Sequence, residues 1–101
     1  MMKKVIWSTT AAKSYRENLE YLQDKWTVVE IENFINEVDK AVQHISDNPY
    51  IGKVSDVSQH YRQLLVVKQI TLYYRVTTDH IRLVCFFNNF KDPERLQEFL
   101  S

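Results

Sequence analysis

The chain has 101 residues, a length that fits one domain whose core needs no disulfide or metal to fold. Lys and Arg number 13, as do Asp and Glu, and a net charge of zero argues against a strongly basic nucleic-acid-binding protein. The single cysteine, Cys85, excludes an internal disulfide, and no apolar run reaches the roughly 18 residues of a membrane span. Without a leader pattern or metal-ligand spacing, we expect a soluble cytoplasmic protein, one domain over residues 1–101, with no cofactor or metal.

Net neutrality hides an uneven distribution of charge. Residues 1–47 carry 6 Lys/Arg and 8 Asp/Glu, residues 48–90 carry 5 and 2, and residues 91–101 carry 2 and 3. The middle segment is therefore the basic part of the chain. Its excess of positive charge is modest for a protein that binds nucleic acid through the phosphates.

The first half predicts a short strand followed by a helical hairpin. Residues 3–7 form the strand, and Ser8 or Thr9 caps a helix whose apolar positions recur at intervals of three and four. Thr27 and Glu30 have the spacing of a capping box, which opens a second helix with the same intervals. The predicted core positions are Ala12, Tyr15, Leu19, Leu22 and Trp26 in the first helix, and Val28, Ile31, Ile35, Val38, Val42 and Ile45 in the second.

Three consecutive strands are predicted in residues 60–90, with turns near residues 68–69 and 78–79. The polar loop before them, residues 48–59, contains the only glycine, Gly52, which suits a positive φ. In the middle strand, Ile70, Leu72, Tyr74 and Val76 alternate with Gln69, Thr71, Tyr73, Arg75 and Thr77. One face of this strand should therefore enter the core, while the other presents an arginine flanked by hydroxyl groups that can meet an anion.

The element order predicts an α+β fold. An N-terminal strand and a helical hairpin precede a three-stranded antiparallel meander, which forms one sheet covered by the helices. A short C-terminal helix should follow residues 92–94, where Asp-Pro-Glu supplies a cap, a first-position proline and a first-turn acid. A small apolar patch on this helix is predicted to bind a partner protein. Its residues are Leu96, Phe99 and Leu100.

Short segments spread along the chain have an order and spacing typical of one superfamily. They are Trp7-Ser8-Thr9-Thr10-Ala11, Asn48-Pro49-Tyr50-Ile51-Gly52, Tyr61-Arg62-Gln63-Leu64, Leu72-Tyr73-Tyr74-Arg75-Val76, Phe86-Phe87-Asn88-Asn89 and Asp92-Pro93-Glu94-Arg95-Leu96. In these segments the chain resembles the RelE/ParE superfamily of type II toxin–antitoxin toxins, which includes plasmid stabilisation proteins. The resemblance implies a growth-arresting toxin that is neutralised by a cognate antitoxin in a hetero-oligomer.

The ribonuclease branch of this superfamily supplies one functional hypothesis. Its members cut ribosome-bound mRNA through attack of a ribose 2′-hydroxyl on the adjacent phosphate, which needs a base, a cation and an acid but no metal. The resemblance places Arg75 against that phosphate and Arg62 at a second basic position on the preceding strand. Proton transfer could then be assisted by Tyr73, Lys53 or Lys91. The candidates for phosphate or RNA contacts are Lys53, Asn88 and Lys91.

Ordinary structural roles remain open for the same residues. Arg75 could instead form a cross-strand ion pair or lie on a solvated face. Arg62 could extend its side chain along the neighbouring apolar run to reach solvent, and Tyr73 could simply pack against its neighbours. Residues 88–91 depart from the ribonuclease pattern, because asparagines stand where active members carry histidine or arginine, and asparagine transfers no proton at neutral pH.

Two further functions therefore stand beside mRNA cleavage. The first is a ParE-like toxin that inhibits DNA gyrase by binding it, with no catalytic residues. The second is a catalytically inactive RelE/ParE-like relative that acts only through protein binding. All three functions imply an antitoxin partner, and the basic sheet face is compatible with each of them.

Overall fold

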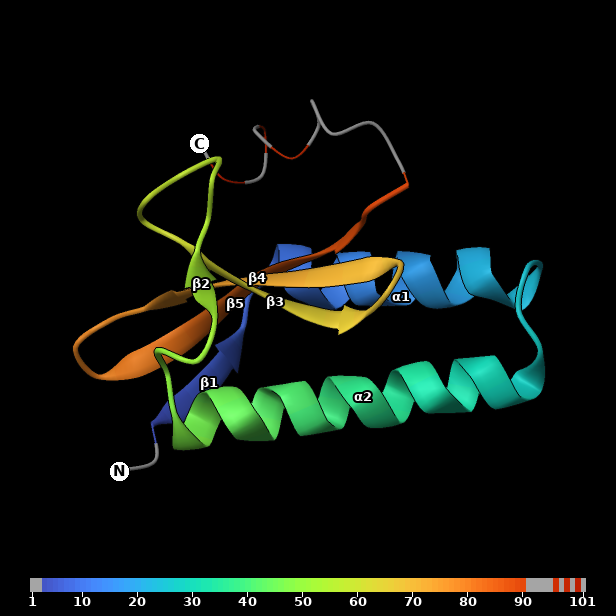
Figure 1. The fold of residues 1–101 in the computed structure, drawn as a ribbon, viewed down its shortest axis with the longest axis horizontal. Coiled ribbons are helices and arrows are strands. Elements are labelled where there is room, and N and C mark those ends of the chain that lie inside the picture. Colours follow the sequence, from blue (N-terminus) through green and yellow to red (C-terminus); the bar gives the residue numbers. More distant parts are fainter. Residues whose placement is uncertain (1–2, 91–95, 97, 99, 101) are drawn as a thin grey trace.

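Two helices lie along one face of a single five-stranded sheet (Figure 1). The computed structural model describes residues 3–90 together with Leu96, Glu98 and Leu100. The sheet order is β1-β5-β4-β3-β2, with β1 parallel to β5 and the other pairs antiparallel. The elements are β1 (Lys4–Trp7), α1 (Thr9–Gln23), α2 (Val28–Asp47), β2 (Lys53–Val54), β3 (Arg62–Val67), β4 (Ile70–Val76) and β5 (His80–Asn88). Neither helix has the length and apolar character to cross a membrane.

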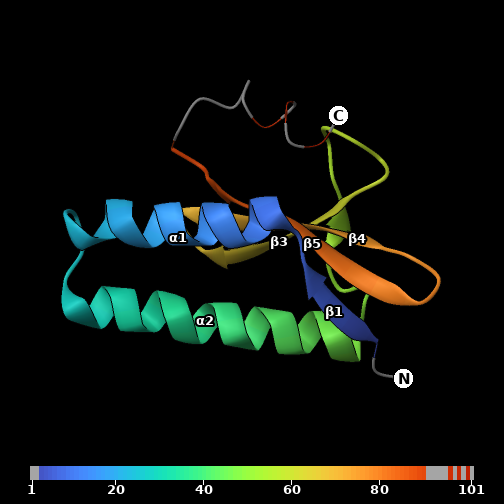
Figure 2. The ribbon, with the colours of Figure 1, turned by 180° about the vertical axis from the view of Figure 1, so that it is seen from behind.

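The predicted α+β class is confirmed, but the sheet differs from the predicted three-stranded meander. The N-terminal strand β1 joins the sheet beside β5, as the reverse view also shows (Figure 2). The loop at residues 48–59 contributes the edge strand β2, which pairs with the first two residues of β3. Two residues are too few to show a period-2 pattern, so β2 has no signal in the sequence. The start of the predicted C-terminal helix lies outside the described residues, although Leu96, Glu98 and Leu100 are helical.

Both helix starts follow the capping chemistry predicted from the sequence. The Ser8 hydroxyl accepts a hydrogen bond from the Ala11 N–H at 2.9 Å at the start of α1. Thr27 and Glu30 form a complete capping box at the start of α2, in which each side chain bonds the other's backbone. Such caps satisfy backbone donors that have no partner within the helix.

The buried face of α2 is rotated from the predicted one. Phe34, which the predicted stripe omitted, is fully buried in the core, whereas Ile35 is 36% exposed and Val28 is 70% exposed. Both stripes satisfy helical spacing, so periodicity alone does not choose between them. The buried positions of α2 are Phe34, Val38, Ala41 and Ile45. The same correction applies in α1, where Ala11 is buried and Ala12 is exposed.

The central strand β4 is buried on both faces. Ile70, Leu72 and Tyr74 enter the helix-side core, as predicted. Thr71 and Tyr73 on the opposite face are buried as well, so that face is not the open polar surface that the sequence predicted. Its cover is a second apolar cluster formed by Tyr73, Cys85, Phe87, Leu96 and Leu100, against which Tyr61 and Val84 pack.

Polar side chains of α1 complete the hydrogen bonding of β5 beyond the end of β1. The Ser8 hydroxyl donates to the Val84 carbonyl at 3.1 Å. The Ser14 hydroxyl accepts from the Phe86 N–H at 2.9 Å, and the Asn18 amide donates to the Phe86 carbonyl at 2.9 Å. Asn18 is buried, and buried amides require such partners. Helix α1 therefore acts as both a cover for the sheet and a substitute for a longer edge strand.

The loop after α2 is fixed to the sheet by the buried hydroxyl of Tyr74. This hydroxyl accepts a hydrogen bond from the Gly52 N–H and donates one to the Pro49 carbonyl, both at 2.9 Å. The φ of Gly52 is not positive, so that prediction is wrong. Glycine is needed for space, because a Cβ at this position would lie 2.6 Å from the Tyr74 hydroxyl and 2.7 Å from the Gln63 carbonyl.

Leu22→Ala should lower the free energy of unfolding by about 2–5 kcal/mol, because Leu22 is buried in the core between the helices and the sheet. Urea denaturation measures this change. The matched control is Leu65→Ala, since Leu65 is 61% exposed and the same truncation there should cost under about 0.5 kcal/mol. Equal losses at both positions would contradict the packing described above.

Candidate functional site

One end of the sheet's outer face carries exposed positive charge. Arg75 on β4 and Arg82 on β5 are direct cross-strand partners, and both are exposed. Ile6 on β1 pairs with Arg82 in the parallel register, and Lys4 lies two residues earlier on the same face. We call Lys4, Ile6, Arg75 and Arg82 the cationic end of the sheet.

Strand alternation explains why these side chains face away from the helices. Tyr74 and Leu83 enter the helix-side core, and successive side chains of a strand point to opposite faces. Arg75 and Arg82 therefore share the face that holds the second apolar cluster. They lie nearer the β4–β5 turn than the paired residues Tyr73 and Cys85 of that cluster, so the cluster leaves them exposed.

The two arginines form no ion pair with any residue in the described part of the chain. The ion pairs found there are Lys13–Glu17, Lys40–Glu37, Lys53–Asp56 and His80–Asp79. Like charges directly opposite each other in a sheet are destabilising. Two adjacent guanidinium groups supply several N–H donors for one carboxylate or phosphate. The arrangement thus disfavours the isolated chain and favours binding of an anion.

Arg62 lies on the other face of the sheet from Arg75. It pairs in register with Tyr74, and its Nη1 donates a hydrogen bond to the Gly52 carbonyl at 2.7 Å. The guanidinium group also lies 4.9 Å from the centre of the Tyr50 ring, a cation–π contact. The structure therefore does not bring the two predicted arginines together, and Arg62 holds the loop after α2 in place.

Tyr73 shares a face with Arg75 but is enclosed by the second apolar cluster. It is 5% exposed, and its ring meets that of Phe87 edge-on at 6.5 Å. Burial, with smaller contributions from Cys85 and Asp56, raises the pKa of the Tyr73 hydroxyl. A phenol that is harder to ionise is a poor base at neutral pH, and its contacts are those of a packing residue. Its catalytic role remains a prediction.

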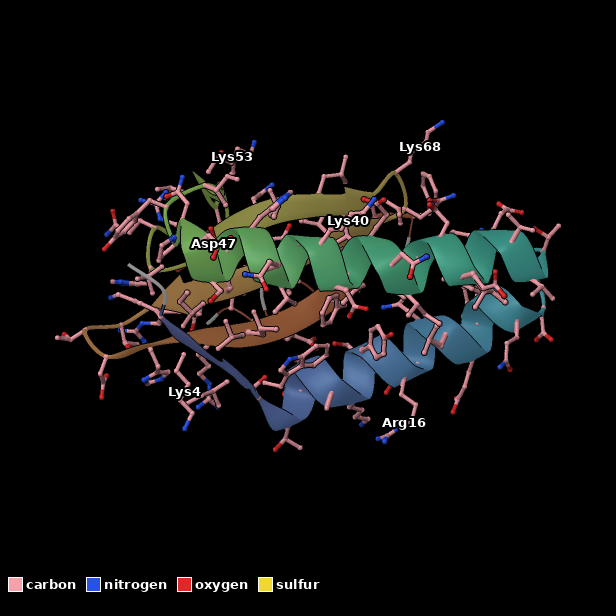
Figure 3. The ribbon with its side chains drawn as sticks, turned by 90° about the horizontal axis from the view of Figure 1, so that it is seen from below. Lys4, Arg16, Lys40, Asp47, Lys53 and Lys68 are labelled. Carbon is pink, nitrogen blue, oxygen red and sulfur yellow. The ribbon has the colours of Figure 1, made fainter. Side chains whose placement is uncertain are left out.

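Neither Asn88 nor Lys53, two of the predicted phosphate-binding residues, lies at the cationic end. Asn88 is 5% exposed, and its Oδ1 accepts a hydrogen bond from the Phe90 N–H at 2.9 Å. Lys53 lies at the β2 edge, across the sheet from Lys4, and contacts Asp56 at 3.6 Å (Figure 3). Two strand spacings, roughly 10 Å, separate β2 from β4. Lys91 lies outside the described residues.

Two of the three predicted partner-binding residues lie on the outer face of the sheet. Leu96 and Leu100 are buried in the second apolar cluster, while Phe99 lies outside the described residues. As placed, these leucines cover the sheet and do not offer an open docking patch. Their predicted role in partner binding requires them to leave the cluster.

Arg82, Ile6 and Lys4 are the site residues that the sequence reading missed. Arg82 stands between Ile81 and Leu83, so the alternation that identified Arg75 also marks Arg82. Alternation along each strand does not reveal that the two arginines are opposite each other, because a different register between β4 and β5 would place them apart. The described residues contain no group of three His, Cys, Asp or Glu side chains able to hold a metal ion.

The imidazole nearest to the cationic end in the described part of the chain belongs to His80, which pairs in register with Lys4. Its Nδ1 lies 3.0 Å from the Thr77 hydroxyl and 3.2 Å from the Asp79 carboxylate. Hydrogen bonding to His80 is the main cause that lowers the pKa of the Asp79 carboxyl. The cationic end therefore adjoins one imidazole, positioned by its neighbours in the β4–β5 turn.

Comparison with known proteins identifies a family match over most of the chain. The family described as ParE toxin of type II toxin-antitoxin system, parDE, matches residues 5–88. Toxin ParE1 from Mycobacterium tuberculosis is 31% identical over 78 residues, which cover 76% of this chain and 79% of that protein. These matches confirm the resemblance to the RelE/ParE superfamily identified from the sequence.

Solved structures share the fold at low sequence identity. A chain of the chromosomal ParDE system from P. aeruginosa has a TM-score of 0.72 at 14% identity, covering 86% of this chain and 96% of its own. The YoeB dimer from Staphylococcus aureus gives 0.59 at 14% identity, covering 89% and 100%. The E. coli DinJ-YafQ complex gives 0.58 at 13% identity, covering 90% and 100%. At these identities the likeness shows the fold alone.

Arg82→Glu should stabilise the isolated protein by about 0.2–1 kcal/mol, because a like-charge pair with Arg75 becomes an attractive one. The gain should appear in urea denaturation at low salt and shrink in 1 M NaCl, where charges are screened within about 3 Å. The control is Arg75→Glu combined with Arg82→Glu, which restores a like-charge pair and should lose the gain. A gain retained in the double variant would contradict the repulsion.

Stability should fall as the pH rises from about 9 to about 12, because burial raises the pKa of the Cys85 thiol from 9.0 to about 12. The folded state favours the protonated thiol. Its contribution to the free energy of unfolding is complete below about pH 9 and is lost above it, because the thiol ionises at a lower pH in the unfolded chain than in the folded one. The loss approaches about 4 kcal/mol as an upper limit. Cys85→Ala should show a shallower decline in urea denaturation over this range, and an unchanged slope would refute the assignment.

Proposed function

Because the chain belongs to the family of ParE toxins of type II toxin–antitoxin systems, we propose that it arrests growth by binding its target and not by cutting RNA. The proposed target is DNA gyrase, and the proposed contact surface is the cationic end of the sheet. Gyrase acts on the chromosome, so the proposed location is the cytoplasm.

The observation that carries this proposal is an exposed arginine pair without a matching acid–base pair. Metal-independent cleavage of RNA needs one group to remove a proton and another to donate one, both within hydrogen-bond reach of the phosphodiester. Among the described residues, Tyr73 is enclosed with a raised pKa and Asn88 is buried. His80 is the one imidazole that the described residues place near Arg75 and Arg82, and a single imidazole cannot perform both roles at the same moment.

His80 also favours the second candidate function, mRNA cleavage on the ribosome. It lies two residues from Arg82 on the same strand face, roughly 7 Å along the strand. In this alternative the arginine pair stabilises the charge on phosphorus, and His80 acts as base and then acid in separate steps. The assays below therefore include His80→Gln.

We propose further that a cognate antitoxin neutralises the chain and forms a hetero-oligomer with it. Structural neighbours were solved as such complexes, among them DinJ-YafQ and YoeB-YefM. An acidic antitoxin segment would complement Arg75 and Arg82 and remove the repulsion between them. The same surface would then serve the target in the free toxin and the antitoxin in the complex.

The proposal predicts that Arg75→Glu combined with Arg82→Glu abolishes growth arrest on induced expression and weakens inhibition of gyrase supercoiling by at least about tenfold. The control is Lys13→Glu combined with Lys40→Glu, which reverses two exposed charges on the helices and should leave both readouts unchanged. Purified protein should leave mRNA intact on programmed ribosomes.

Two other outcomes would overturn the gyrase proposal, and a third would overturn only its contact surface. Ribosomal cleavage that disappears with His80→Gln would establish the nuclease alternative. Supercoiling inhibition that survives both arginine substitutions would exclude the cationic end as the contact surface. No activity in either assay, with antitoxin binding retained, would identify an inactive relative that acts only through protein binding.

A further inference from the structure

The outer edge of β3 is a second surface that could bind a partner, through backbone groups that β2 does not cover. β2 covers only the start of this edge. Because the two strands are antiparallel, the pairing that reaches furthest along β3 is that of Lys53 with Gln63. The Tyr61 carbonyl accepts a hydrogen bond from the Ser55 N–H on the β2 side, so alternate residues after Tyr61 direct their backbone to that side. By this alternation, Leu65 presents its N–H and C=O outward, beyond the end of β2. An edge of this kind is a template for another strand.

A register shift enlarges this open edge. The pairing of β3 with β4 slips between Leu65 and Val67, which leaves Val66 as an extra residue without a direct partner. The side chain of Leu65 is 61% exposed on the outer face, whereas Val66 turns toward α2 and is 8% exposed. The edge therefore offers backbone groups together with an apolar side chain on one side and a hollow on the other.

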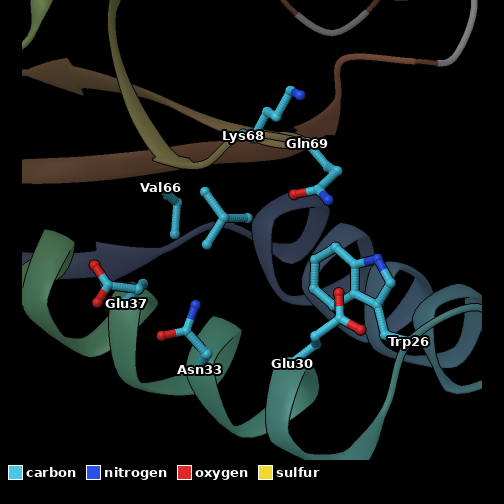
Figure 4. Close-up of a pocket in the computed structure, with 8 residues that line it drawn as sticks. Trp26, Glu30, Asn33, Glu37, Val66, Lys68 and Gln69 are labelled. Carbon is cyan, nitrogen blue, oxygen red and sulfur yellow. The ribbon is translucent and has the colours of Figure 1, made fainter.

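The hollow lies between α2 and the β3–β4 turn, directly below this edge (Figure 4). Its volume is about 420 Å³, enough for one long side chain. Apolar surface comes from the two valines of β3 and from an indole ring, and polar groups line the α2 side. The lining residues are Trp26, Glu30, Asn33, Glu37, Val66, Val67, Lys68 and Gln69.

The chemistry of the hollow suits a cation on an aliphatic stem. One carboxylate oxygen of Glu30 serves the capping box, which leaves the other oxygen available. Glu37 contacts only the exposed Lys40, at 3.3 Å, among the ion pairs of the described residues. Lys68 points away from Trp26 and Glu30 (Figure 4). Glu30 lies beside the Trp26 indole, and Glu37 lies two helical turns further along α2, at the other end of the hollow (Figure 4). A carboxylate beside an indole attracts a lysine or arginine head, while the stem packs on apolar surface.

We propose that the outer edge of β3 accepts an extended segment of the antitoxin as an added strand, with one lysine or arginine inserted between Glu30, Glu37 and Trp26. Side chains of such a strand alternate between the hollow and the outer face that carries Leu65. The segment recognised is therefore a basic residue with an apolar residue immediately before or after it. This inference rests on the proposed antitoxin pairing.

The test measures binding of the cognate antitoxin to the full chain by calorimetry. Glu30→Gln combined with Glu37→Gln should weaken binding about tenfold, and the loss should diminish in high salt. Glutamine preserves the side-chain shape and also serves in a capping box, so the fold is retained. The control is Glu20→Gln combined with Glu32→Gln, which neutralises two exposed helix carboxylates outside the hollow and should change nothing.

Amide hydrogen exchange tests the added strand independently of charge. The Leu65 N–H should exchange quickly in the free chain and at least tenfold more slowly in the complex. Antitoxin binding with a Leu65 amide that stays unprotected, or with equal affinity for the Glu30/Glu37 variant and its control, overturns this inference and leaves the antitoxin pairing intact. Absence of any antitoxin binding overturns the pairing itself, and this inference with it.

Discussion

Burial of β4 and β5 on both faces is the constraint on which the rest of this structure depends. The helices cover one face over Tyr74 and Leu83, and the second apolar cluster covers the other over Tyr73 and Cys85. A strand enclosed in this way cannot carry uncompensated charge, because desolvating an unpaired ion is too costly. Exposed arginines are tolerated only where the outer cover ends. The position of the cationic end thus follows from the extent of the apolar cover.

The same constraint determines what the edges of the sheet can bind. Helix α1 uses Ser14 and Asn18 to satisfy β5 where β1 has ended, so that edge is closed by the chain itself. On the other side, the buried Tyr74 hydroxyl fixes the loop from Pro49 to Gly52, and β2 begins directly after it. A loop anchored at that point lets β2 reach only the first two residues of β3, and the backbone beyond them remains available.

Two surfaces of opposite charge therefore lie on different parts of one small domain. The cationic end occupies the outer face near β1, and the acidic hollow lies below the β3 edge beside α2. A partner that contacts both needs acidic residues in one segment and a basic residue in another, separated by the width of the sheet. Opposite charges at two separated points fix the orientation of a bound segment and reject a reversed one. Under the two proposals above, this arrangement would let a chain of zero net charge bind its partner selectively.

The sequence by itself determined the element types, the helix starts at Ser8 and Thr27, and the superfamily, because these depend on local periodicity, capping chemistry and the order of short segments. The tertiary structure alone decided which residues meet. Periodicity in α2 allowed either Phe34 or Ile35 to face the core, and contact with the sheet selected Phe34. Arg62 and Arg75 looked equivalent on neighbouring strands, yet they lie on opposite faces. A repeat shows which residues share a face, but strand register and the packing of distant elements determine what that face meets.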